Sequence, residues 1–164
     1  MRYRMTFSKT EAMRFTSHLD LHTTIERTMR RANLPLVYSQ GFTPRPKLSL
    51  ASALPLGFTS AAEVAEFWLK EDLPVDQIAK AMHAAAPPGL VIHKIETAAE
   101  DAPNLQNALS SAWFLITFRE AHAGLETRVA EARDLALLLR IEGGTEQVTD
   151  AAHMLLQIRT EIES

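Results

Sequence analysis

Residues 17–35, SHLDLHTTIERTMRRANLP, contain the signals that begin, orient and end one amphipathic helix. Ser17 and Asp20 form a Ser-x-x-Asp capping box, which predicts a helix start near His18. Apolar side chains then recur every three or four residues and form one stripe. This stripe consists of Leu21, Ile25, Met29 and Ala32. Asn33 is available as the C-terminal cap, just before the proline that ends the helix.

Alternating apolar and polar residues around this helix predict four short strands. These segments are residues 2–7, 47–52, 62–70 and 90–95. Pro74 begins a second helix, whose buried line we expect at Val75, Ile78 and Met82, and a Pro-Pro-Gly sequence ends it. The order strand–helix–strand–strand–helix–strand is that of the split βαβ, or ferredoxin-like, arrangement. It predicts an α+β fold with a four-stranded antiparallel sheet and two helices on one face.

The length of the chain, 164 residues, suits one domain with a partial second lobe. We expect the ferredoxin-like domain over residues 1–97, a linker over residues 98–110 and a partial second α+β lobe of the βαβ type over residues 111–164. The expected elements of this lobe are a strand over 112–118, a helix over 125–140 and a strand over 154–162.

The composition excludes several kinds of site and location. The chain contains no cysteine, which excludes disulfides, thiolate zinc sites and cysteine-ligated iron–sulfur clusters. It contains no run of about 18 apolar residues, so we expect no transmembrane helix and no membrane partner. The N-terminus lacks the apolar core of a signal peptide, and we therefore expect a bacterial-type cytoplasmic location.

Charge is distributed unevenly along the chain. Residues 1–50 contain nine Lys or Arg and three Asp or Glu, which gives this part a net charge of +6. Because the whole chain carries −3, the other 114 residues carry −9. Such a division indicates a local anion-binding face. The alternative is that charges gather by chance on a solvated surface.

The loop at residues 38–47, YSQGFTPRPK, combines basic, aromatic and turn-forming residues. We expect Gly41 to adopt a positive φ angle, and the two prolines to hold Arg45 extended between them. Tyr38 and Phe42 offer flat surfaces on which bases stack, and arginine pairs well with phosphate. Basic residues interleaved with aromatic ones are typical of proteins that bind single-stranded RNA.

We therefore predict one nucleic-acid or anion-binding surface. Its expected residues are Lys9, His18, Arg30, Arg31, Tyr38, Gln40, Gly41, Phe42, Arg45 and Lys47. In this hypothesis the four cations from Arg30 to Lys47 converge on the His18 end of the first helix. The alternative is a solvated helix face, a tyrosine and a phenylalanine anchored in the core, and a plain connecting loop.

Several short motifs, in this order, resemble those of one protein family. They are SHLDL at 17–21, RRA at 30–32, LPL at 34–36, YSQGF at 38–42 and LPLG at 54–57. The chain resembles the radical-SAM-linked domain family, domain of unknown function 2344, most clearly over residues 1–95. This resemblance implies a bacterial domain that occurs alone or fused behind a radical S-adenosylmethionine protein. It therefore implies a radical S-adenosylmethionine partner, and it implies no established activity.

Catalytic and metal-binding patterns are sparse. His18 and His22 share a helical face near Asp20, but zinc requires three or four ligands and no other cluster supplies them, so we predict no metal and no cofactor. His18 is the one candidate catalytic residue. As a general base, with Lys47 or Lys9 stabilising the transition state, it would resemble ferredoxin-like ribonucleases that process CRISPR repeats, an analogy at the level of the fold.

The sequence thus favours an accessory domain over an enzyme. We expect it to bind RNA, or to position an RNA substrate for the radical S-adenosylmethionine partner. The alternative is a protein-interaction domain that docks on this partner. A second alternative is a metal-independent ribonuclease.

Overall fold

The computed structural model describes residues 1–99, 101–108, 115–116, 127 and 157–158. The chain forms two compact units, Met1–Ala108 and Leu109–Ser164, each of which is described by itself. The main elements of the first unit are β1 (Arg2–Lys9), α1 (His18–Arg31), β2 (Leu48–Leu50), β3 (Ser60–Trp68), α2 (Val75–Ala85) and β4 (Leu90–Ala98). A 3-10 turn, η1 (Glu11–Met13), follows β1, and a short helix, α3 (Leu105–Ala108), ends the unit.

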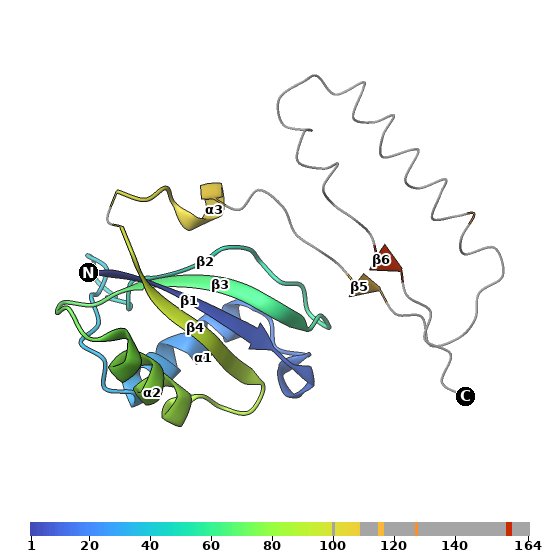
Figure 1. Cartoon of the computed structure of the whole chain (residues 1–164), viewed down its shortest axis with the longest axis horizontal. Helices are drawn as coiled ribbons and strands as arrows, with labels where there is room; N and C mark the ends of the chain where they lie inside the picture. Colours follow the sequence, from blue (N-terminus) through green and yellow to red (C-terminus); the bar gives the residue numbers. More distant parts are fainter. Residues whose placement is uncertain (100, 109–114, 117–126, 128–156, 159–164) are drawn as a thin grey trace, which may run out of the picture. The chain divides into compact units, whose positions relative to one another are not determined.

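The four strands form one antiparallel sheet in the order β2-β3-β1-β4. Strand β3 lies between β1 and β2, and β1 lies between β3 and β4. The two strands that each helix connects therefore run in the same direction and are separated by a third strand. Helices α1 and α2 lie on one face of the sheet, and α3 lies on the other (Figure 1). The predicted α+β class, with a four-stranded antiparallel sheet and two main helices, is confirmed.

The hydrophobic core lies between the sheet and the two helices. On β1 the side chains of Tyr3, Met5 and Phe7 are buried, because alternate residues of a strand point to the same face. The predicted apolar stripe of α1 meets them through Leu21, Ile25 and Met29, and α2 contributes Ile78 and Met82. Burial of these side chains holds the helices on the sheet.

Both ends of α1 carry the predicted caps. The Ser17 side chain accepts a hydrogen bond from the Asp20 amide at 3.2 Å. At the other end Asn33 adopts the left-handed conformation, with a φ of 52°. The Leu34 amide then donates to the Met29 carbonyl at 3.3 Å, which closes a Schellman-type turn. The signals that predict this helix are local in sequence, and the structure confirms them.

On the face of the sheet opposite α1 and α2, the Glu66 carboxylate is fully buried between two arginines. Arg2 and Arg4 each donate two hydrogen bonds to it, and those from Arg4 measure 2.8 and 3.1 Å. Arg2 also donates to the carbonyls of Ala102 and Pro103 at 2.7 and 2.9 Å. This group, which we call the Arg2–Glu66–Arg4 triad, joins β1, β3 and the chain segment after β4.

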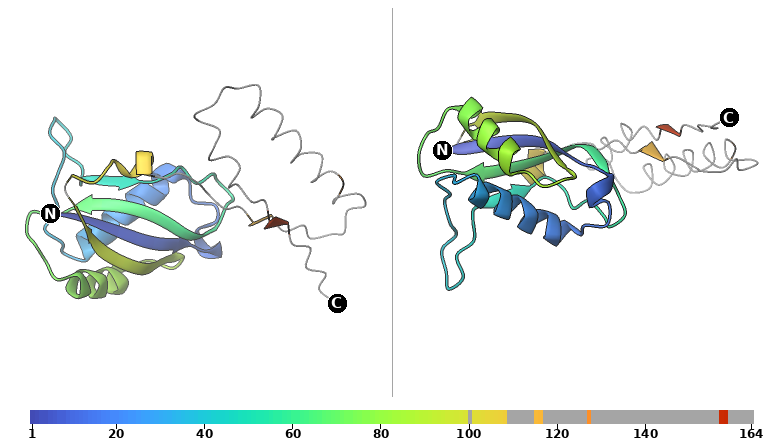
Figure 2. Two further views of the ribbon diagram at one scale, coloured as in Figure 1. Left: turned by 45° about the horizontal axis from the view of Figure 1, so that its top comes forward. Right: turned by 90° about the horizontal axis from the view of Figure 1, so that it is seen from below.

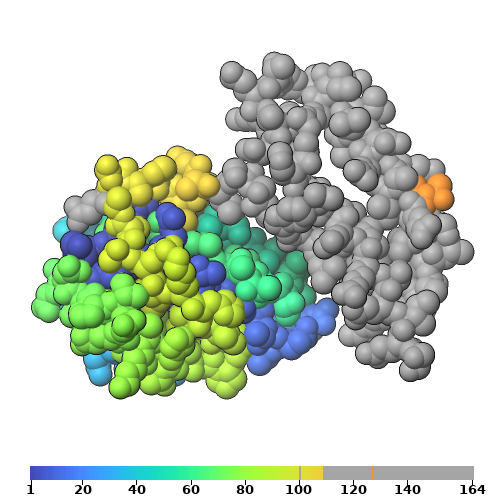
Figure 3. Space-filling model, in the orientation of Figure 1, coloured from blue at the N-terminus to red at the C-terminus, as the bar shows by residue number. Residues whose placement is uncertain are grey.

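The start of the expected linker packs on this face of the sheet. Residues 98–108 belong to the first unit, and the side chain of Leu105 is buried. In the space-filling view, atoms of the α3 segment, in golden yellow, lie directly against the rest of the unit (Figure 3). Arg2 explains this packing, because its guanidinium hydrogen-bonds three carbonyls of the segment.

The second unit contributes two described strands, β5 (Leu115–Ile116) and β6 (Gln157–Ile158), which pair in parallel. They fall within the two segments predicted as strands. Apart from Thr127, which is helical, the helix predicted over 125–140 lies outside the described residues. None of the helices that the structure describes is long and apolar enough to cross a membrane.

Replacing Glu66 by Gln should strongly destabilise the first unit. The change keeps the shape of the side chain but leaves the buried Arg2 and the half-buried Arg4 without their counter-charge. Loss of one partner from a buried ion pair costs about 3–5 kcal/mol of the free energy of unfolding. Urea denaturation followed by circular dichroism measures the change, with the exposed Glu71→Gln as control. A loss no larger than that of Glu71→Gln would show that the triad contributes little.

Candidate nucleic-acid interface

The predicted binding loop is an ordered hairpin, which we call the 38–46 hairpin. Tyr38 pairs with Pro46 in an antiparallel bridge, and the Ser39 amide donates to the Arg45 carbonyl at 2.8 Å. The Arg45 amide in turn donates to the Ser39 hydroxyl at 3.1 Å. Figure 2 shows this hairpin projecting from the body of the first unit. Hydrogen bonds between its two strands stabilise the hairpin, and its tip therefore lies away from the core.

The tip of the 38–46 hairpin presents an aromatic ring and a backbone turn to solvent. Gln40, Gly41 and Phe42 are exposed, and Phe42 contacts nothing that shields it. Gly41 has a φ of 129°, so the predicted positive φ is confirmed. No atom lies within 4 Å of the position that a Cβ would take there, and glycine is therefore favoured by backbone conformation rather than by lack of space.

The hairpin is joined to the end of α1 through Arg30. The Arg30 guanidinium carbon lies 5.9 Å from the centre of the Tyr38 ring, within the range of a cation–π contact. Its Nη2 atom is 4.0 Å from the Glu26 carboxylate, too far for a hydrogen bond. Arg30 thus keeps most of its capacity to bind an anion.

Three arginines of α1 line a surface groove of about 480 Å³, together with two other residues. The lining residues are Thr24, Arg27, Arg30, Arg31 and Pro87. We call this feature the arginine groove. Thr24, Arg27 and Arg31 are spaced by three and four residues and share one helical face. Within the described part of the chain, Arg27 and Arg31 have no ion-pair partner.

Lys47 lies on the opposite face of the sheet from the arginine groove. Its Nζ atom is 4.3 Å from the centre of the Trp68 ring, which Arg2 contacts as well. Trp68 alternates with the buried Phe67 along β3, so its ring points away from the helices. A ligand bound in the arginine groove therefore contacts Lys47 only if it extends around the edge strand β2.

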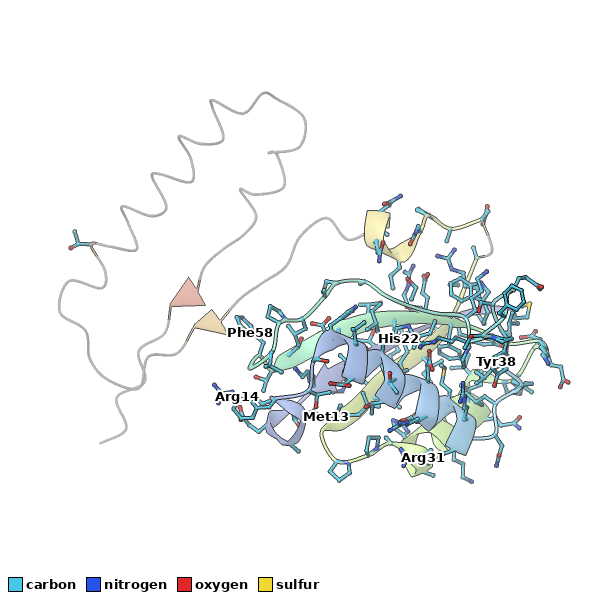
Figure 4. All side chains as sticks on the ribbon, turned by 180° about the vertical axis from the view of Figure 1, so that it is seen from behind. Met13, Arg14, His22, Arg31, Tyr38 and Phe58 are labelled. Atoms are coloured by element: carbon cyan, nitrogen blue, oxygen red, sulfur yellow. The ribbon has the colours of Figure 1, made fainter. Side chains whose placement is uncertain are left out.

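Lys9 and His18 lie at the other end of α1 from Arg31. A helix of 14 residues is about 20 Å long, and His18 begins the helix that Arg31 ends. Figure 4 shows the two ends apart, with Arg14 and Phe58 at one and Tyr38 and Arg31 at the other. The expectation that His18 shares one surface with the four cations is therefore wrong, because the length of α1 separates His18 from Arg30 and Arg31.

Lys9 is fully buried at the end of β1. Its Nζ atom donates to the carbonyl of Arg14 at 3.2 Å. Burial lowers the pKa of Lys9 from its ordinary value of 10.5, and Glu63 partly opposes the shift. A side chain so enclosed does not contact an external phosphate.

The two histidines of α1 differ in their contacts. The Nδ1 atom of His18 is buried without a hydrogen-bond partner. His22 is turned inward, with its Nε2 atom 3.3 Å from the Leu48 carbonyl and its Nδ1 atom 3.3 Å from Glu26. Among the residues that the structure describes, no group of three His, Asp or Glu side chains is placed to hold a metal.

The structure divides the basic residues of the first fifty into two sets. Four of them serve the fold. Arg2 and Arg4 pair with Glu66, and Lys9 is buried. Arg14 donates a hydrogen bond to the Gly57 carbonyl and lies 3.6 Å from the Glu11 carboxylate. The remaining five are exposed. These five exposed cations are Arg27, Arg30, Arg31, Arg45 and Lys47. The first three come from the second half of α1, Arg45 comes from the 38–46 hairpin, and Lys47 lies just before β2. Four of the five belong to the predicted surface, whereas Arg27 was not predicted, because only burial distinguishes it from the cations that serve the fold.

Comparison with known proteins gives one result. The sequence model of a family described as "Uncharacterized protein conserved in bacteria (DUF2344)" matches residues 2–163. No curated protein and no solved structure matches the chain. The match includes both units, whereas the motifs found by inspection lie within the first.

Replacing Lys9 by Met should leave the stability at pH 7 unchanged or raise it. Between the lowered pKa of the folded state and 10.5, the unfolded chain binds more protons, so the contribution of Lys9 to stability rises with pH in this window. The advantage of Lys9→Met over wild type should therefore shrink as pH rises. Thermal melts from pH 7 to pH 10 measure it, with the exposed Lys80→Met as control. A variant that is clearly less stable at pH 7 would show that the buried ammonium is stabilising.

Proposed function

The chain belongs to the DUF2344 family of uncharacterized bacterial proteins, and we propose that its first unit is a ferredoxin-like domain that binds single-stranded RNA. The strand order β2-β3-β1-β4, with each helix connecting two strands that a third one separates, supports the ferredoxin-like assignment. The fold itself does not specify a ligand. The proposed ligand rests on the exposed side chains.

The observation that carries the proposal is the grouping of the exposed cations with aromatic rings. Arg30 contacts the Tyr38 ring, and Arg45 lies on the same hairpin as the exposed Phe42. Guanidinium groups donate paired hydrogen bonds to phosphate, and aromatic rings stack on bases of any sequence. A strand of RNA has both groups in regular alternation, which a small anion or an acidic protein surface lacks.

The proposed role is that of an accessory domain. The resemblance to radical-SAM-linked domains motivates a radical S-adenosylmethionine partner that performs chemistry on RNA held by this domain. A ribonuclease activity of the domain itself receives no support from the geometry. His18 lies at the far end of α1 from the hairpin, Lys47 is on the other face of the sheet, and Lys9 is fully buried.

Single-stranded RNA should bind with an affinity that falls steeply with salt concentration. Arg45→Ala should lower the affinity. It should also reduce the magnitude of the slope of log affinity against log salt concentration by about 0.7, because one phosphate contact is lost. Phe42→Ala should weaken binding by about 1–3 kcal/mol and leave the slope unchanged, because it removes stacking alone. Fluorescence anisotropy with a labelled oligonucleotide from 50 to 300 mM salt measures both.

The control is Lys94→Ala, which removes one positive charge from β4, at the opposite edge of the sheet from β2. If Lys94→Ala changes affinity and slope as much as Arg45→Ala, binding depends on net charge rather than on the hairpin. A protein that does not bind RNA even at 50 mM salt would refute the proposal.

A second candidate function, docking on a protein partner, is supported by a different surface. Four apolar side chains are exposed at the start of α1 and in the loop after β2. They are Phe15, Leu19, Leu56 and Phe58, with exposed fractions of 79%, 76%, 62% and 45%. Hydrogen bonds between Arg14 and Gly57 hold the two segments together. We call these four residues the apolar patch. Exposed apolar groups of this size often mark protein interaction sites.

Leu56→Asp should abolish association with a radical S-adenosylmethionine protein encoded in the same genome, while RNA affinity stays within twofold of wild type. A charge placed in the apolar patch must be desolvated when the partner docks. Pull-down from cells that produce both proteins measures the association. Phe42→Ala is the matched control, because it removes an exposed apolar side chain from the hairpin instead. Equal loss with both variants would contradict a specific role for the patch.

A further inference from the structure

We propose that the arginine groove is a phosphomonoester site, and that it takes the terminal phosphate of the bound RNA strand. This inference rests on the proposed RNA-binding function and adds which group of the RNA is recognised. It is motivated by the three arginines that line one groove, of which Arg27 and Arg31 have no ion-pair partner in the described part of the chain. Thr24 and Pro87 complete its walls.

The stability of α1 does not explain all three arginines. The negative end of the helix dipole favours cations in the last turn, which accounts for Arg30 and Arg31. Arg27 lies one turn earlier and is spaced four residues from Arg31, so that two like charges are neighbours on one face. Such a pair is unfavourable unless an anion is bound between them. A ligand that binds both guanidinium groups converts this repulsion into binding energy.

The number of charges favours a terminal phosphate over a phosphodiester. A phosphomonoester carries a charge of about −1.5 to −2 at pH 7 and three acceptor oxygens, whereas a diester of the backbone carries −1. Glu26, 4.0 Å from Arg30, is the one acid that pairs with a groove arginine among the described residues. Even with Glu26 counted in full against Arg30, the groove holds an excess of two positive charges, which matches a terminal phosphate better than a diester.

The shape of the groove agrees with this assignment. Its volume, about 480 Å³, is in the range of pockets that hold small ligands. A terminal phosphate projects from the strand and enters a concave site, whereas an internal phosphate has the chain on both sides. Arg30 borders the groove and also contacts the Tyr38 ring, so the nucleotides that follow a bound terminus lead toward the 38–46 hairpin.

Three oligonucleotides of one sequence test the inference: one with a 5′-phosphate, one with a 3′-phosphate and one with hydroxyl groups at both ends. We expect one of the phosphorylated forms to bind about tenfold to a hundredfold more tightly than the hydroxyl form. Charge-assisted hydrogen bonds from the arginines to the terminal phosphate provide this gain in affinity. Arg31→Gln should remove this preference. Arg45→Ala should weaken all three forms and keep the preference. Lys94→Gln should change neither.

The outcomes separate the two proposals. If all three oligonucleotides bind equally well, the groove is no phosphomonoester site, while RNA binding stands. If none binds but adenosine monophosphate binds and adenosine does not, the groove takes a free nucleotide, and the RNA proposal fails. If Arg31→Gln does not fold, Arg27→Gln provides the same test, because Arg27 is exposed and pairs with no described residue. A preference that survives both substitutions overturns the inference.

Discussion

The buried Glu66 carboxylate is the constraint on which much of the first unit depends. It accepts hydrogen bonds from Arg2 and Arg4 on the neighbouring strand β1, and thereby pairs β1 with β3 at the centre of the sheet. A charge in this position is costly unless it is fully paired, and the geometry supplies four donors. Arg2 extends the same network to the carbonyls of Ala99, Ala102 and Pro103. One carboxylate therefore links two paired strands through their side chains and, through Arg2, also holds the segment that ends in α3.

This triad also determines which cations remain available for binding. The net charge of +6 over residues 1–50 indicates a strongly basic face, yet a carboxylate outside that range, Glu66, neutralises part of it. Apart from Lys47, the positive charge of residues 1–50 that is left on the surface belongs to α1 and to the 38–46 hairpin. These two segments are contiguous in space because Arg30 stacks on Tyr38. The exposed positive surface is thus smaller than the charge count along the chain implies.

The sequence predicts those features whose causes are local. The Ser17 cap, the left-handed Asn33 and the positive φ of Gly41 each depend on a few neighbouring residues, and each is confirmed. The burial of Lys9 is not predictable in this way. Strand alternation assigns Lys9 to a face, but whether that face is covered depends on η1 and on the chain around Arg14. The pairing of Glu66 is likewise set by strand register, 62 to 64 residues away in sequence.

Helix α1, whose start and end the sequence predicts, also separates the two candidate surfaces, the apolar patch and the arginine groove. Helix α1 has 14 residues and a length of about 20 Å, with the apolar patch near its first turn and the arginine groove near its last. Two ligands bound at these places do not compete for the same side chains. If a partner docks on the patch while an RNA terminus occupies the groove, the helix sets the distance between them. An accessory domain that positions a substrate requires a rigid spacing of this kind, and a helix capped at both ends and packed on the sheet provides it.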